Sequence, residues 1–103
     1  MRFLNIFILF IFIIIPFHIN ADEFLELGKK IFLEKGNCAS CHALTDAQSQ
    51  GDIGPNLNQI KPQLQRVIIA VTNGIGVMPA YDGILTTSEI KAVAKYVAEK
   101  SNQ

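Results

Sequence analysis

The chain has 103 residues, a length typical of one small domain, and 50% of them are hydrophobic. Its 9 basic residues balance its 9 acidic residues, and loss of the first 21 residues would leave 8 basic against 9 acidic. This balance excludes a strongly basic surface of the kind that binds nucleic acid or an anionic membrane. The sequence has no internal repeat and no Ser/His/Asp set for nucleophilic catalysis.

The first 21 residues have the organisation of a secretory leader. Arg2 gives a basic start, residues 3–17 are almost wholly apolar, and Ala21 is a small residue suited to cleavage. The apolar run is shorter than the roughly 20 residues that span a bilayer comfortably. We therefore predict a signal peptide at 1–21 and export of the rest to the periplasm. The alternative is an uncleaved membrane anchor, because Ile19 occupies a position where a small residue is preferred.

A first helix is predicted to follow the leader. It has acidic residues at its start, Lys35 at its end, and Gly36 and Asn37 as its stop signal, with Gly36 at C′. Gly28 lies inside this helix, where glycine is unfavourable unless another helix crosses closely. The apolar residues at helical spacing are Phe24, Leu27, Ile31 and Phe32.

The pentapeptide Cys38-Ala39-Ser40-Cys41-His42 follows directly. Two cysteines separated by two residues and followed by histidine form the attachment sequence of a c-type haem. Each sulfur adds to one porphyrin vinyl group, and His42 then lies under the iron with Nδ1 free to donate to a backbone acceptor. A thioredoxin-like motif would need a βαβ surround, and a structural zinc site would need four ligands. A plain disulfide would leave His42 unexplained.

Beyond this motif, residues 45–58 are polar and predict a loop. A second helix is predicted over 62–72, with Pro62 at N1 and Gly74 just past its end, and we expect it to form one wall of the haem pocket. Its expected buried face consists of Leu64, Val67, Ile68 and Val71.

Residues 73–81 form a glycine-rich loop that contains Met78. If the leader is removed, Met78 is the only methionine and His42 the only histidine. A loop can place a thioether on the distal face of the haem, so Met78 is predicted to be the second axial iron ligand.

The last helix is the clearest in the sequence. Thr86 and Glu89 fit a capping box, and Tyr96 is expected to pack on Phe32 near Gly28, where the two terminal helices cross. The apolar stripe of this helix is Ile90, Val93, Ala94, Val97 and Ala98.

Over nearly all of residues 22–103, the chain resembles the small bacterial class I cytochromes c. The resemblance is carried by Gly28 and Phe32, residues 38–42, Gly54-Pro55-Asn56-Leu57, Val77-Met78-Pro79-Ala80, Leu85-Thr86 and Tyr96-Val97. It implies an all-α, class I cytochrome c fold with three main helices around one covalently attached haem. By resemblance, His42 and Met78 are the axial ligands, and the Pro55 carbonyl accepts the Nδ1 proton of His42.

These features predict a periplasmic one-electron carrier rather than an enzyme, because two axial ligands leave the iron no open position. Its partners would be redox proteins: a periplasmic dehydrogenase, a membrane cytochrome complex or a terminal oxidase. They would dock near the haem edge, at Cys38, Cys41, Ala80 and Tyr81. Contact with a membrane is expected only if the leader is retained. Arg66 and Lys61 are the candidate partners of the haem propionates.

Two alternatives stay open. The compact size and residues 74–85 are similar to cytochromes that accompany sulfite dehydrogenases, so the chain could be the dedicated cytochrome subunit of a periplasmic dehydrogenase. A haem enzyme or gas sensor would require Met78 to be absent from the iron or readily displaced.

Overall fold

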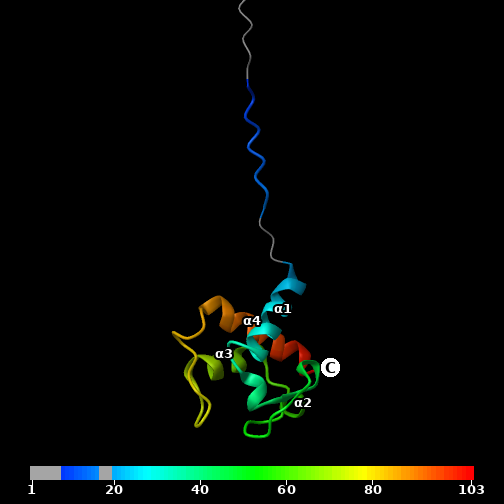
Figure 1. Cartoon of the computed structure of the whole chain (residues 1–103), viewed down its shortest axis with the longest axis vertical. Helices are drawn as coiled ribbons and strands as arrows, with labels where there is room; N and C mark the ends of the chain where they lie inside the picture. The colour runs from blue at the N-terminus through cyan, green and yellow to red at the C-terminus, as the bar shows by residue number, and fades with distance from the viewer. Residues whose placement is uncertain (1–7, 17–19) are drawn as a thin grey trace, which may run out of the picture.

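The computed structural model describes residues 8–16 and 20–103 (Figure 1). Three main helices, α1 (Ala21–Leu33), α3 (Leu64–Asn73) and α4 (Thr87–Lys100), build the domain, and this confirms the predicted all-α architecture. Shorter elements lie between α1 and α3: η1 (Cys38–Ser40), β1 (Ala43–Leu44), η2 (Thr45–Ala47), β2 (Ser49–Gln50) and α2 (Leu57–Ile60). Strands β1 and β2 are antiparallel, with Ala43 opposite Gln50 and Leu44 opposite Ser49.

The predicted leader falls partly on residues 1–7 and 17–19, which lie outside the described residues. Residues 8–16 have no helix or strand and are exposed. Among the described residues, no helix has both the length and the apolar character needed to cross a membrane. Helix α1 begins at Ala21, where the side chain of Asn20 accepts a hydrogen bond from the Asp22 amide at 3.1 Å. Cleavage after Ala21 stays a prediction.

The terminal helices α1 and α4 pack against each other (Figure 1). Gly28 lies at their contact with Ala92 and Tyr96, as predicted. Gly28 is buried, and a Cβ atom there would collide with the Ala92 carbonyl and would lie 2.6 Å from Cβ of Tyr96. Beside it, the rings of Phe32 and Tyr96 meet edge to face, with their centroids 5.8 Å apart. Aromatic pairs favour this arrangement, which adds to the burial of both rings. The absence of a side chain at Gly28 therefore brings the two helices into close contact.

The first helix departs from its predicted outline in two ways. Its buried stripe includes Leu25, which packs partly on the core, whereas Leu27 is 38% exposed. Gly36 is not in the left-handed conformation expected of a C′ glycine; the left-handed residue is Asn37, with φ 48°. The amide of Gly36 instead donates to the Ile31 carbonyl at 2.7 Å. This bond folds the chain back so that the Cys38 motif starts beside the helix end.

Helix α3 begins two residues later than predicted. Gln63 is its N-cap, so Pro62 precedes the helix and does not occupy N1. Leu64 is 44% exposed because it lies in the first turn, away from the core, while Val67 and Val71 are buried as predicted. Gly74 ends the helix with φ 72°, also as predicted.

Helix α4 has the predicted capping box. The Glu89 amide donates to the Thr86 hydroxyl at 3.1 Å, and the Thr86 amide donates to the Glu89 carboxylate at 2.9 Å. Lys35 approaches the same carboxylate at 2.8 Å and 2.9 Å, linking the end of α1 to the start of α4. The hydrogen bond from the Lys35 ammonium group is the main cause that lowers the pKa of Glu89. The bond from the Thr86 amide lowers it further. Of the predicted stripe, Ile90, Val93, Ala94 and Val97 are buried and Ala98 is half-buried.

The segment predicted as a loop over 45–58 contains more structure than its composition indicated. Segments η2 and α2 are single helical turns, and β2 pairs with β1 through two residues only. Elements this short are too short to show a hydrophobic period, so their polar sequence cannot be distinguished from that of a loop. This small hairpin is an addition to the three main helices that the resemblance implied.

Candidate haem site

An apolar cavity of about 380 Å³ lies between the three main helices and two loop segments, residues 53–55 and 75–78. Its helical walls come from all three main helices: Phe32 of α1, Val67, Ala70 and Val71 of α3, and Val93 and Val97 of α4. Phe32, Val67, Val71, Val93 and Val97 are among the most buried residues of the domain. The cavity is therefore lined by the hydrophobic core itself, and helix α3 forms one of its walls as predicted.

His42, Pro55 and Met78 all line this cavity, although they come from three separate segments of the chain. Nδ1 of His42 lies 2.8 Å from the Pro55 carbonyl oxygen. A carbonyl can only accept a hydrogen bond, so Nδ1 carries a proton, and in the neutral ring Nε2 then keeps its lone pair. The imidazole is thereby fixed in the tautomer that can donate through Nε2 to a metal.

Gly54 packs directly on the imidazole ring. A Cβ atom at this position would lie 2.5 Å from Cε1 and 2.8 Å from Nδ1 of His42. Its own amide donates to the Cys41 carbonyl at 2.8 Å, which ties the 54–55 segment to the Cys38 motif. Only glycine leaves the ring enough space at this point.

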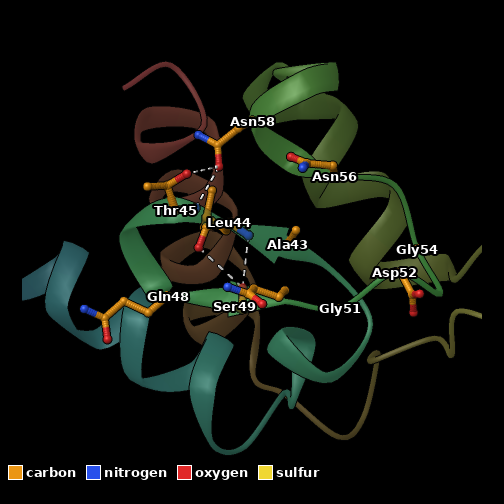
Figure 2. Close-up of a pocket in the computed structure, with 11 residues that line it drawn as sticks. Ala43, Leu44, Thr45, Gln48, Ser49, Gly51, Asp52, Gly54, Asn56 and Asn58 are labelled. Carbon is orange, nitrogen blue, oxygen red and sulfur yellow. Dashed lines mark hydrogen bonds between the residues drawn. The ribbon is translucent and has the colours of Figure 1, made fainter.

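A polar concavity of about 720 Å³ lies beside β1 and β2, and Figure 2 shows its lining. Here Ser49 accepts a hydrogen bond from the Leu44 amide at 3.0 Å and donates to the His42 carbonyl at 2.9 Å. Asn58 accepts from the amide of Thr45 at 2.7 Å (Figure 2). None of these polar groups suits an apolar macrocycle. Their role on this side is to fix the backbone that carries His42.

Cys38 begins the single helical turn η1, and Cys41 caps the end of that turn. The amides of Cys41 and His42 both donate to the Cys38 carbonyl, at 3.1 Å and 2.9 Å. Cys38 lines the apolar cavity, whereas Cys41 does not contribute to its lining. Burial raises the pKa of the Cys38 thiol to about 11, and hydrogen bonding to its own backbone opposes this only in part.

Met78 reaches the cavity from a tight turn between α3 and α4. Ile75 and Met78 exchange backbone hydrogen bonds of 3.1 Å and 2.9 Å across Gly76 and Val77. Such a two-residue turn requires a positive φ at its first central position, and Gly76 provides it with φ 57°. The turn exposes Val77 (88%) but leaves Met78 packed against the core.

The two candidate propionate partners differ in their placement. Arg66 of α3 lines the cavity, whereas Lys61 is an exposed, left-handed residue at the end of α2 and does not line it. Arg66 is therefore the better-placed cation.

These residues fit a haem attached through thioethers. The walls are apolar, the cysteines lie on one helical turn, and the cavity contains a nitrogen donor with a free lone pair and a thioether sulfur. The fold and the site together define the class of c-type cytochromes.

Comparisons with known proteins agree with this class. The family model described as cytochrome c oxidase, cbb3-type, subunit III matches residues 24–97. Cytochrome c6 of Leptolyngbya boryana is 36% identical over 80 residues, covering 74% of this chain and 92% of that protein. Cytochrome c6 of Tetradesmus obliquus is 36% identical over 89 residues, covering 81% of this chain and 96% of that protein.

The crystal structure of the c-type cytochrome SorU from Sinorhizobium meliloti superposes with a TM-score of 0.75 at 51% identity. It covers 80% of this chain and 95% of that protein. The chain belongs to the cytochrome c family, as a small monohaem class I cytochrome c with covalently bound haem c.

Two groups near the site could not be recognised from the sequence alone. Ser49 holds the His42 carbonyl, and the hydroxyl of Tyr81 donates to the Gly36 carbonyl at 2.5 Å. Both are common polar residues whose partners lie far along the chain or across a turn. No spacing rule indicates such bonds.

Proposed function

We propose that this cytochrome is a periplasmic one-electron carrier whose haem is bound through Cys38 and Cys41 and ligated axially by His42 and Met78. The observation that carries the proposal is the bond from Nδ1 of His42 to Pro55. It leaves Nε2 free to donate into the same apolar cavity that Met78 lines. When bound, haem supplies an Fe(II)/Fe(III) couple, and a methionine ligand raises its potential.

The residues of the chain define how the electron is transferred. With His42 and Met78 as the two axial ligands, neither oxygen nor substrate can bind at the iron, so electrons pass by outer-sphere transfer. The apolar walls exclude water and favour the less charged reduced state. Because the Pro55 bond holds the imidazole, the ligands need little rearrangement between oxidation states.

The rim of the cavity supports docking of a protein partner. Four apolar residues line the cavity and are also largely exposed: Ile53 (68%), Ile60 (54%), Ile75 (66%) and Val77 (88%). Arg66 is the one charged residue in the cavity lining. An apolar rim of this kind suits a brief contact with a redox protein, and its association should depend only weakly on salt.

Optical spectra of the exported holoprotein in both oxidation states, combined with mass measurement, test the proposal. We expect a mass that includes one haem, a low-spin spectrum with methionine ligation, and loss of that ligation in Met78→Ala. Carbon monoxide should not bind the reduced native protein. Ready carbon monoxide binding without denaturant would contradict the proposal and favour a gas sensor or haem enzyme.

The same experiment addresses the leader. A mass lacking residues 1–21 and a periplasmic location would support the signal peptide. Retention of those residues in a membrane fraction would support the anchor.

The alternative proposal is a dedicated cytochrome subunit of a periplasmic dehydrogenase, for example a sulfite dehydrogenase. It is supported by the compact size and by residues 74–85, which are similar to cytochromes that accompany sulfite dehydrogenases. Purification from native membranes and periplasm separates the two proposals. A stable complex with one dehydrogenase indicates the subunit, and a free monomer that accepts electrons from several donors indicates the carrier.

A further inference from the structure

Tyr81 joins the loop that carries Met78 to the segment that carries the first haem cysteine. Its hydroxyl donates to the carbonyl of Gly36 at 2.5 Å, across 45 residues of sequence. Gly36 is buried and lies two residues before Cys38. A single side chain therefore connects the distal loop to the attachment motif.

The backbone of Tyr81 is fixed as firmly as its side chain. Its amide donates to the Val71 carbonyl of α3 at 2.8 Å, and its carbonyl accepts from the amides of Ile84 at 3.0 Å and Leu85 at 2.9 Å. Tyr81 is thus bonded to helix α3, to the turn that leads into α4 and to the Cys38 segment. These contacts make it a fixed point at the exit of the distal loop.

The loop before this point has few constraints of its own. Within residues 75–80, the hydrogen bonds of the described chain join only Ile75 and Met78 to each other. Val77 and Ile75 are 88% and 66% exposed, so packing holds this turn weakly on its outer side. The position of Met78 relative to Cys38 therefore depends on the two loop ends, Gly74 and Tyr81.

We propose that Tyr81 is a positioning residue that holds Met78 on the haem iron by fixing the distal loop to Gly36. The proposal rests on the axial role of Met78 given above. Without the hydroxyl, the Gly36 carbonyl loses its partner in a buried position, and the loop can move away from the attachment segment. Met78 then leaves the iron more often, although the rest of the fold is unchanged.

Tyr81→Phe tests this idea because it keeps the ring and removes only the donor. Imidazole is the probe, since it binds the ferric iron only when Met78 has left. We expect the apparent imidazole affinity to rise about fivefold to tenfold, as the loss of one hydrogen bond predicts. We also expect a weaker methionine-to-iron charge-transfer band and a lower reduction potential.

Tyr96→Phe is the matched control, because it removes a tyrosine hydroxyl that bonds Asp46 away from the distal loop. It should lower the denaturation midpoint but leave imidazole affinity and the charge-transfer band at their wild-type values. Equal imidazole affinity in Tyr81→Phe and wild type would overturn the proposal. An equal rise in both tyrosine variants would do the same, because it would reveal general loosening.

Met78→Ala separates this proposal from the one on which it rests. If Met78 is the ligand, Met78→Ala binds imidazole far more tightly than either tyrosine variant. If Met78→Ala and wild type bind it equally, Met78 is not an iron ligand and both proposals are wrong. If Met78→Ala alone binds tightly, the ligand assignment holds and the role of Tyr81 is refuted.

Discussion

Gly54→Ala should displace the imidazole of His42. The added Cβ would lie 2.5 Å from Cε1, 2.8 Å from Nδ1 and 2.9 Å from Nε2 of the ring. Unbonded heavy atoms prefer separations of about 3.5–4.0 Å, so the ring would have to move by roughly 1 Å. Such a move breaks the 2.8 Å bond from Nδ1 to the Pro55 carbonyl. The ring would lose its orientation together with its space.

The cost follows from these two effects. Overpacking a well-packed position costs about 1–3 kcal/mol, and losing a neutral hydrogen bond costs about 0.5–1.5 kcal/mol. Backbone conformation adds no separate penalty, because Gly54 has no positive φ. We therefore expect Gly54→Ala to lower the free energy of unfolding of the holoprotein by about 2–4 kcal/mol and to change its low-spin spectrum.

Guanidinium denaturation followed at the main haem absorption band measures this effect, with Gly83→Ala as the control. Gly83 has φ 83° and no heavy atom within 4 Å of an added Cβ, so alanine there costs only backbone strain of about 1–2 kcal/mol. The control should keep the wild-type spectrum. The reasoning fails if Gly54→Ala also keeps that spectrum and unfolds no earlier than Gly83→Ala.

Three further substitutions test the scaffold by denaturation of the holoprotein. Gly28→Ala should lower the free energy of unfolding by at least about 3 kcal/mol, the upper end for overpacking, because its Cβ would meet the rigid backbone of Ala92. Near-wild-type stability of this variant would contradict the close helix crossing. Thr86→Ala should cost about 1 kcal/mol through loss of the N-cap, with the haem spectrum unchanged.

Tyr96→Phe should lower the free energy of unfolding by about 1.5 kcal/mol at neutral pH, and this difference should become smaller in acid. The Tyr96 hydroxyl is the main cause that lowers the pKa of Asp46. The stabilisation is therefore complete above the unfolded pKa of about 3.9 and is lost as the pH falls through the lower folded value. A difference between variant and wild type that stays undiminished as the pH falls below the unfolded pKa would disprove the link.

The sequence was most informative where local chemistry determines the structure. The capping box located the start of α4 to the residue, because this signal acts within the first turn of the helix. The Cys38 motif is a signal of the same local kind, since the spacing of two cysteines and a histidine is fixed by one rigid macrocycle, and the haem c that it implies agrees with the family. Gly28 was interpreted correctly because a glycine inside a helix needs a reason, and a close crossing provides one.

The misses have a common physical cause. Pro62 is acceptable both at N1 and just before a helix, so its presence did not fix the start of α3. Gly36 and Asn37 can each adopt the conformation that ends a helix, and the bond from the Gly36 amide to the Ile31 carbonyl accompanies the left-handed conformation at Asn37. Ser49 and Tyr81 act through carbonyls that a sequence pattern cannot reveal. Particular hydrogen-bond partners, rather than residue preferences, determine these last features.

The helices and the connecting segments have different roles in this small domain: the helices determine its stability, and the connecting segments determine how His42 and Met78 are oriented. The helices provide deeply buried apolar walls such as Phe32 and Val93, and they contact each other directly at Gly28. The groups that orient His42 and Met78 lie in the connecting segments, where Pro55 acts on His42, and Tyr81 on the Met78 loop, through one side-chain hydrogen bond each. Substitution in a helix should therefore change stability first, whereas substitution in these segments should change ligation and potential first. The two effects can be separated by comparing denaturation with spectra on the same variants.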